Sequence, residues 1–96
     1  MVNLPRDKIA AFCEKHHIAK LSVFGSALTA DFGPASDVDF LVAFEPGHVP
    51  GLIRLAGMEQ ELTGIIGRKA DLRTAGDLSR YFRDKVLAAA VPQYVR

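Results

Sequence analysis

The sequence VFGSALTADFGPASDVDFLV, residues 23–42, decides the fold of this chain. An apolar run ends at Gly25 and Ser26, a link rich in small residues follows, and a second apolar run then opens with Asp37 and Asp39. Successive side chains of a strand point to opposite faces, so both aspartates are expected on one face. Adjacent carboxylates repel each other, and such a pair persists when one pKa is raised or a cation is bound. The stretch therefore predicts two strands whose junction carries an acidic site.

The turn at Gly25 and Ser26 adds a second feature to this junction. Backbone N–H groups of such a turn can point toward an anion. An anion-binding turn beside a cation site is what a complex of a metal ion with a nucleotide requires. The alternative without a binding site is that the acids are solvated and that the Gly-Ser pair is only a turn.

Length and composition limit the classes of protein that fit. The chain has 96 residues, of which 49% are hydrophobic and 24% charged, and its formal net charge is +1. These values predict one domain over residues 1–96 and offer no broad basic field for long nucleic acid. The single cysteine, Cys13, excludes an internal disulfide, and nothing near it in the sequence would activate a thiolate. Without a signal-like segment or an apolar stretch of about 18 residues, we expect a cytoplasmic protein with no membrane association.

Hydrophobic periodicity predicts the elements around the deciding stretch. Helices are expected at residues 5–17, 26–31, 52–66 and 78–90. Strands are expected at residues 19–24, 37–44 and 68–74. The last helix is expected to bury a stripe formed by Leu78, Phe82, Val86 and Ala89. The tail at residues 91–96 either folds back onto the body or offers an edge to another chain. This order predicts an α/β (α+β) fold with a small mixed sheet and helices mainly on one face.

A third acid lies in the last predicted strand. There Lys69, Asp71 and Arg73 alternate with apolar or small residues, which predicts one charged face. If this strand neighbours the strand at 37–44, Asp71 joins Asp37 and Asp39 on the open face. Three unpaired acids on one face would be destabilising without a cation, so we favour a cation site over three solvated carboxylates.

These residues resemble a known motif. Gly25-Ser26, followed after ten positions by Asp37-Val38-Asp39 and later by Asp71 on a strand, resembles the polymerase-β-like nucleotidyltransferase superfamily. Within it, the size of the chain is similar to that of the minimal nucleotidyltransferase (MNT) domain, and the resemblance covers essentially the whole chain. It implies a polymerase-β-like fold with a small mixed sheet.

The resemblance also implies roles for individual residues. ATP would be the substrate, with its β- and γ-phosphates against Gly25 and Ser26. Asp37 and Asp39 would hold two Mg²⁺ ions, and Asp71 would complete the second metal site and help deprotonate or orient the acceptor hydroxyl. Ser36 would fix the entry to the strand and contact phosphate or metal-bound water.

The family further implies a partner. MNT proteins of this kind resemble antitoxins encoded beside a HEPN-domain ribonuclease, whose tyrosine they adenylylate. The expected function is therefore transfer of AMP from Mg–ATP to a hydroxyl, a tyrosine, of a HEPN-type toxin held in a hetero-oligomer.

The sequence departs from the family motif Gly-Ser-x-Ala-Arg-Gly. Thr29 stands in place of the arginine, and Ala30 in place of a glycine able to take positive φ. A second hypothesis therefore stays open, in which the chain is a catalytically weak or inactive binding module that neutralises its partner sterically.

Overall fold

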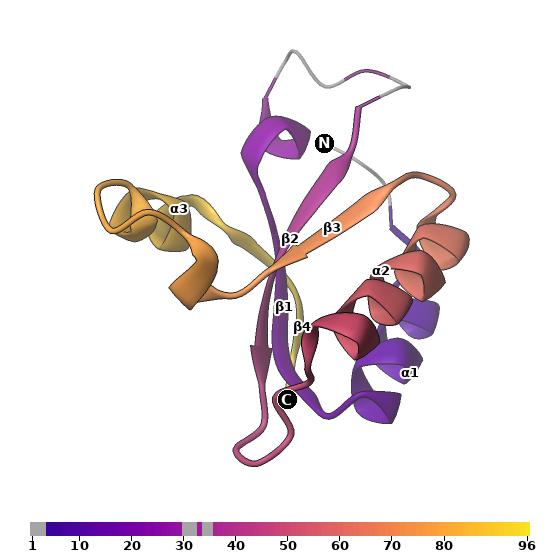
Figure 1. Cartoon of the computed structure of the whole chain (residues 1–96). Helices are drawn as coiled ribbons and strands as arrows, with labels where there is room; N and C mark the ends of the chain where they lie inside the picture. Colours follow the sequence, from indigo (N-terminus) through magenta and orange to yellow (C-terminus); the bar gives the residue numbers. More distant parts are fainter. Residues whose placement is uncertain (1–3, 30–32, 34–35) are drawn as a thin grey trace.

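The structure is a computed structural model that describes residues 4–29, 33 and 36–96 of the chain. Its elements follow in the order α1 (Arg6–Lys15), β1 (Ile18–Phe24), the 3₁₀ turn η1 (Gly25–Leu28), β2 (Val38–Phe44), α2 (Leu52–Ile66), β3 (Ala70–Arg73), the 3₁₀ turn η2 (Ala75–Asp77), α3 (Arg83–Ala89) and β4 (Val91–Val95) (Figure 1). The strands form one sheet in the order β3-β2-β1-β4. β1 is antiparallel to β2 and β4, whereas β2 and β3 are parallel, which confirms the predicted mixed sheet. None of the helices described is long and apolar enough to cross a bilayer.

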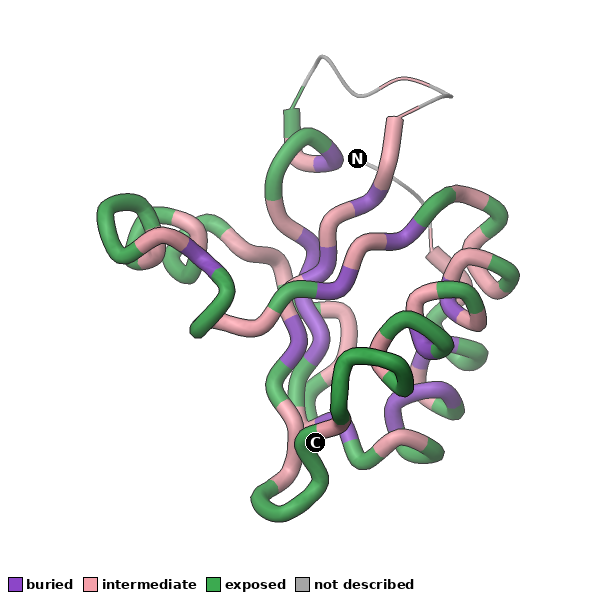
Figure 2. The backbone as a smooth tube through the Cα atoms, viewed as in Figure 1, coloured by how far each residue is buried: buried purple, intermediate pink, exposed green. Residues whose placement is uncertain are grey.

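The two faces of the sheet are covered differently. α1 and α2 lie together on one face, and α3 lies on the other (Figure 1). Along β2, Val38, Phe40 and Val42 are buried under α1 and α2, while the residues between them point to the α3 face. Buried residues accordingly concentrate along the strands and on the sides of α1 and α2 that meet them (Figure 2). The buried residues of β2 thus follow the period-2 alternation of a strand.

Cys13 belongs to this core. Its side chain is fully buried, and burial, with a smaller contribution from the charge of Glu14, raises the pKa of the thiol to about 12. The thiol therefore stays protonated at neutral pH, which removes the nucleophilic form of cysteine.

The short helix predicted at residues 26–31 is present in the described residues as a 3₁₀ helix, not as an α-helix. Gly25–Leu28 form a single 3₁₀ turn, and residues 30–31 lie outside the part of the chain that the structure describes. Thr29 ends the turn because both its N–H (3.0 Å) and its hydroxyl (2.9 Å) donate to the carbonyl oxygen of Ser26. A continuing α-helix would need that carbonyl for residue 30, so the threonine side chain competes with the helix.

The last predicted helix is also wrong in extent. α3 covers only Arg83–Ala89, and its expected stripe is not buried, since Phe82 is 50% exposed and Ala89 is exposed. A capping box between Thr74 and Asp77 closes the separate turn η2 first. Leu78, which alone of the stripe is buried, then leaves that turn in an extended conformation.

The apolar tail forms β4, a strand that was not predicted. Of the two alternatives stated for residues 91–96, the structure has the fold-back onto the body. β4 pairs with β1 through Leu21 and Tyr94 and through Val23 and Val91. This pairing makes β1 a central strand and carries α3 to the face opposite α1 and α2.

The outer edge of β3 is capped by side chains of α2. The N–H of Ala70 donates to Thr63 Oγ1 (2.9 Å), and the N–H of Leu72 donates to Glu59 Oε2 (2.7 Å). Thr63 and Glu59 are one helical turn apart and therefore face the strand together. Capped N–H groups cannot pair with another chain, and the two bonds hold β3 in place beside β2.

Replacing Glu59 with alanine is expected to lower the free energy of unfolding by about 1–2 kcal/mol, because a charge-assisted hydrogen bond is lost and the N–H of Leu72 is left unpaired. Urea denaturation measures this loss. The neighbouring exposed residue Gln60, replaced by alanine, should change the free energy by less than about 0.5 kcal/mol. Equal losses in both variants would show that the bond to β3 is not the cause.

Candidate active site

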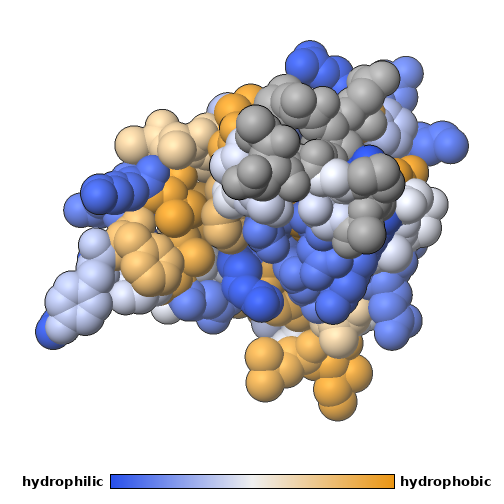
Figure 3. Space-filling model, turned by 90° about the horizontal axis from the view of Figure 1, so that it is seen from above, coloured by the Kyte–Doolittle hydropathy of each residue, from blue (hydrophilic) through white to orange (hydrophobic). Residues whose placement is uncertain are grey.

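Two of the three predicted acids stand side by side on the α3 face of the sheet. Asp39 of β2 is directly in register with Asp71 of β3, and on its other side with Phe24 of β1. Asp37 immediately precedes β2 and lies two residues from Asp39, so backbone alternation directs it toward the same face. The predicted neighbourhood of β2 and β3 is thus confirmed. Hydrophilic side chains cover much of the visible surface when the molecule is viewed from this end (Figure 3).

The charge of this cluster is visible in the pKa of Asp39. Partial burial raises the pKa of Asp39, and the charge of Asp71 raises it further. The charge of Asp37 also raises this pKa. Arg73 opposes these effects and lowers it. The net shift is upward, as is expected where carboxylates are crowded together.

Gly25 brings the turn η1 into contact with Asp39. It follows β1 directly, and its φ of +74° lies in the left-handed region that favours glycine. A Cβ atom built on Gly25 would lie 2.6 Å from Asp39 Oδ2. The missing side chain therefore leaves the space in which the carboxylate sits, and the predicted anion-binding turn and the predicted cation ligand are neighbours. Ser26 is exposed at the start of the same turn.

Ser36 holds the loop that leads into β2. Its hydroxyl accepts a hydrogen bond from the N–H of Gly33 (3.0 Å), and its own N–H donates to the carbonyl oxygen of Gly33 (3.0 Å). Arg68 Nη1 donates to the same carbonyl oxygen (2.9 Å). Ser36 and Arg68 are thus both hydrogen-bonded to Gly33 ahead of β2, and the role of Ser36 at the site stays a prediction. Ala30 lies outside the described residues, so the expectation about its backbone stays a prediction.

The basic residues near the acids were not assigned a role from the sequence. Arg73 is in register with Leu41 on the α3 face, two residues beyond Asp71, and its charge acts on Asp39. Lys69 Nζ lies 3.9 Å from Asp37 Oδ2 in an exposed ion pair. The signal was present, because Lys69, Asp71 and Arg73 form the alternating charged row noted above.

The acids are suitable cation ligands by chemistry but are not gathered as a ligand set. Carboxylate oxygens are the hard ligands that Mg²⁺ prefers. Across residues 4–29, 33 and 36–96, no three acidic, histidine or cysteine side chains are arranged so that they could hold one ion. Asp37 is instead in an exposed ion pair with Lys69.

Replacing Arg73 with glutamine is expected to raise the pKa of Asp39 further, because it removes a positive charge that lowers this pKa. Carbon-detected NMR titration of the carboxylates measures the shift. Arg54, exposed on α2, replaced by glutamine, serves as the control and should leave the pKa of Asp39 unchanged. An unchanged pKa in the Arg73 variant would show that its guanidinium does not act on the acids.

Comparison with known proteins places the chain among nucleotidyltransferases. The family described as the nucleotidyltransferase domain matches residues 6–91. A protein of Methanocaldococcus jannaschii named as a candidate protein adenylyltransferase, MJ0435, is 30% identical over 90 residues, which cover 94% of this chain and 95% of that protein. The protein adenylyltransferase MntA of Thermococcus cleftensis is 31% identical over 78 residues, which cover 81% of this chain and 77% of MntA.

Solved structures agree with this assignment. A structure described as a candidate minimal nucleotidyltransferase matches with a TM-score of 0.73 and 32% identity, covering 91% of this chain and 87% of that one. A toxin–antitoxin complex with AMP-PNP matches with a TM-score of 0.77 but only 18% identity, covering 97% of this chain and 75% of that one, and this likeness shows the fold alone. The chain belongs to the nucleotidyltransferase domain family, as a minimal nucleotidyltransferase homologous to MntA.

Proposed function

We propose that residues 1–96 act as one minimal nucleotidyltransferase domain that transfers AMP from Mg–ATP to a hydroxyl of a partner protein. The observation that carries this proposal is that Asp39, Asp71 and Gly25 lie together: Asp39 is in register with Asp71, and its carboxylate occupies the space that a side chain at Gly25 would take. The names of two relatives as protein adenylyltransferases support the class of reaction. The AMP-PNP in the toxin–antitoxin complex of the same fold supports ATP as the nucleotide.

Asp37, Asp39 and Asp71 are the residues that would hold Mg²⁺. Ions held there would supply neutralisation of charge on the triphosphate and on the reacting atoms. The raised pKa of Asp39 fits this role, because a bound cation would offset both the desolvation of the Asp39 carboxylate and its repulsion by Asp71. Asp37 would exchange its partner Lys69 for an ion, and an exposed ion pair of this kind contributes little stability.

The other residues act by positioning. The N–H groups of the turn Gly25–Leu28 would bind the β- and γ-phosphates, and the absence of a side chain at Gly25 lets them approach Asp39. Asp71 would orient the acceptor hydroxyl and accept its proton. The hydroxyl oxygen then forms a bond to the α-phosphorus, the bond from that phosphorus to the bridging oxygen breaks, and pyrophosphate leaves. Ser36 and Arg68 would hold the connecting loop in place throughout.

The partner proposed is a HEPN-domain toxin, and the acceptor a tyrosine of that toxin. Fold neighbours solved as MntA–HepT toxin–antitoxin complexes support an antitoxin role in a hetero-oligomer. The test incubates the chain with its co-expressed HEPN partner, Mg²⁺ and ATP, and uses mass spectrometry to find AMP on the partner. Modification of a tyrosine, absent when Mg²⁺ is chelated, is the expected result. A partner that stays unmodified in the complete mixture would contradict the proposed AMP transfer.

A second candidate, a binding module without turnover, is favoured by one observation. Thr29 replaces the arginine of the family motif, and its hydroxyl is tied to the carbonyl oxygen of Ser26 rather than free to bind phosphate. The double variant Asp37→Asn, Asp39→Asn separates the two candidates. An enzyme loses toxin neutralisation in this variant, whereas a steric inhibitor keeps it and shows no Mg–ATP binding by calorimetry.

A further inference from the structure

We propose that Tyr81 is itself an acceptor of AMP, which a second copy of this chain transfers to it. This inference rests on the proposed function. The chain has two tyrosines, Tyr81 and Tyr94, and they differ in accessibility. Tyr81 is 84% exposed, whereas Tyr94 lies in β4, in register with Leu21, and packs against the core. The hydroxyl of Tyr81 is therefore the tyrosine acceptor that another molecule can reach.

The turn that carries Tyr81 is ordered by its own hydrogen bonds. The N–H of Tyr81 donates to Ser79 Oγ (3.3 Å). The carbonyl oxygen of Ser79 accepts from the N–H groups of Phe82 (3.2 Å) and Arg83 (2.9 Å). Arg83 Nη2 also donates to the carbonyl oxygen of Leu78 (2.9 Å). An ordered turn presents the ring to another protein at a lower cost in conformational entropy than a mobile segment would.

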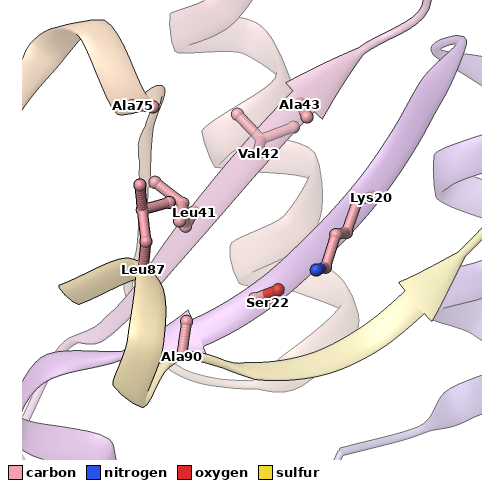
Figure 4. Close-up of a pocket in the computed structure, with 8 residues that line it drawn as sticks. All are labelled: Lys20, Ser22, Leu41, Val42, Ala43, Ala75, Leu87 and Ala90. Atoms are coloured by element: carbon pink, nitrogen blue, oxygen red, sulfur yellow. The ribbon is translucent and has the colours of Figure 1, made fainter. Parts of the chain in front are cut away.

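Helix α3 attaches this turn to the body of the protein. Leu87 and Ala90 face Leu41 of the sheet across a cavity of about 120 Å³ (Figure 4). The turn precedes α3 and lies at the outer margin of the molecule, away from β2 and β3 (Figure 1). Asp39 and Asp71 lie on those two strands. The site that Tyr81 can enter is therefore that of a second copy rather than its own.

The residues around Tyr81 suit contact with an acidic site. Arg80 places its Nη2 3.5 Å from the hydroxyl oxygen of Tyr81 and its guanidinium carbon 5.3 Å from the ring centroid. Two further basic residues, Arg83 and Lys85, follow within four positions, against a single acid, Asp84. The site of the second copy offers the opposite charge in its aspartates and in a bound triphosphate. Attraction between the two surfaces would bring the hydroxyl toward the α-phosphate.

The chemical step is the proposed transfer with a different acceptor. The phenolic oxygen of Tyr81 forms a bond to the α-phosphorus, the bond from that phosphorus to the bridging oxygen breaks, and pyrophosphate leaves. The phenolic proton passes to the carboxylate of Asp71 in the second copy. The product is a chain that carries AMP on the turn before α3.

The test incubates the full chain, without a partner protein, with Mg²⁺ and ATP, and locates AMP by mass spectrometry of proteolytic peptides. The wild-type chain should carry AMP on Tyr81. Tyr81→Phe keeps the ring and removes the hydroxyl, so this variant should carry none. Tyr94→Phe is the matched control and should be modified as the wild type is. Both variants should modify the HEPN partner at the wild-type rate.

A mixture of two variants tests transfer between copies. Asp39→Asn keeps the acceptor and loses the site, whereas Tyr81→Phe keeps the site and loses the acceptor. Neither variant should be modified alone, but the mixture should yield AMP on Tyr81. The peptide that contains this tyrosine comes only from the Asp39→Asn chain, so its modification identifies transfer from the other copy.

Three results would overturn the inference. The first is a wild-type chain without AMP under conditions in which the HEPN partner is modified, a result that leaves the proposed function standing. The others are modification that persists in Tyr81→Phe and a mixture of the two variants that stays unmodified. If neither the chain nor the partner is modified, the proposed function fails as well.

Discussion

Replacing Asp39 with asparagine is expected to lower the rate of AMP transfer at least about a thousandfold, which corresponds to roughly 4 kcal/mol of transition-state stabilisation. Asparagine keeps the size of the side chain and removes its negative charge. Asp39 is in strand register with Asp71, and its carboxylate occupies the space that a side chain at Gly25 would take. Single-turnover transfer to the partner measures the loss. A variant that transfers AMP at the wild-type rate would remove Asp39 from the mechanism.

The same variant should be more stable than the wild-type protein when Mg²⁺ is absent. Folding raises the pKa of Asp39, so the folded protein binds this proton more tightly than the unfolded chain does. The stability that the group contributes is therefore present below its ordinary pKa and is lost as pH rises through the raised pKa. At neutral pH the charge is destabilising, and its removal should raise the free energy of unfolding by about 0.5 kcal/mol, the order found for like charges on neighbouring strands.

Asp77 supplies the control of opposite sign. Hydrogen bonds from the backbone and the side chain of Thr74 lower the pKa of Asp77, so its ionised form stabilises the fold. Asp77→Asn should therefore lower the unfolding free energy at neutral pH, where Asp39→Asn raises it. Urea denaturation of both variants at neutral and at acidic pH measures the two signs. A loss of stability in both variants would show that Asp39 is not under electrostatic strain.

The placement of Asp39 and Asp71 on one face was predictable from sequence, because it is set by the alternation of side chains along a strand. In residues 37–44, every second side chain is apolar and suited to burial under helices, so only one register hides them. Once β3 is constrained in the same way by Ala70 and Leu72, Asp71 must share a face with Asp39. Two short-range patterns therefore determined a contact between residues 32 positions apart, without any knowledge of the chain between them.

The C-terminal third was less predictable because long-range pairing overrides local periodicity there. Phe82 fits a helical stripe in sequence, yet the capping box at Thr74 closes a turn first and α3 begins only at Arg83. The cavity between α3 and the sheet exists because β4 pairs with β1, which brings the preceding helix α3 to the face of the sheet opposite α1 and α2 (Figure 1). No local pattern encodes that pairing. The Thr-x-x-Asp signature of the capping box was, however, readable in the sequence.

Replacing Gly25 with alanine is expected to impair the fold slightly and nucleotide binding strongly. An L-residue at a φ of +74° is strained by about 1 kcal/mol, and this loss should appear in the free energy of unfolding. The new Cβ would also lie 2.6 Å from Asp39 Oδ2, a distance that real contacts do not adopt. The carboxylate is the end of a side chain and can rotate away, so the fold survives, but Asp39 then leaves its position beside Asp71. The affinity for Mg–ATP and the rate of transfer should fall about a hundredfold, the effect expected when a reacting group is misplaced by about 1 Å.

Gly47 separates the steric effect from the backbone strain. Its φ is +81°, close to that of Gly25, and a Cβ atom there would meet nothing within 4 Å. Gly47→Ala should therefore lower stability by a similar amount, about 1 kcal/mol, and leave Mg–ATP binding unchanged. Calorimetry and urea denaturation of the two variants test the argument together. If Gly25→Ala and Gly47→Ala reduced nucleotide affinity equally, backbone strain alone would account for the loss, and the contact between the turn and Asp39 would have no role in binding.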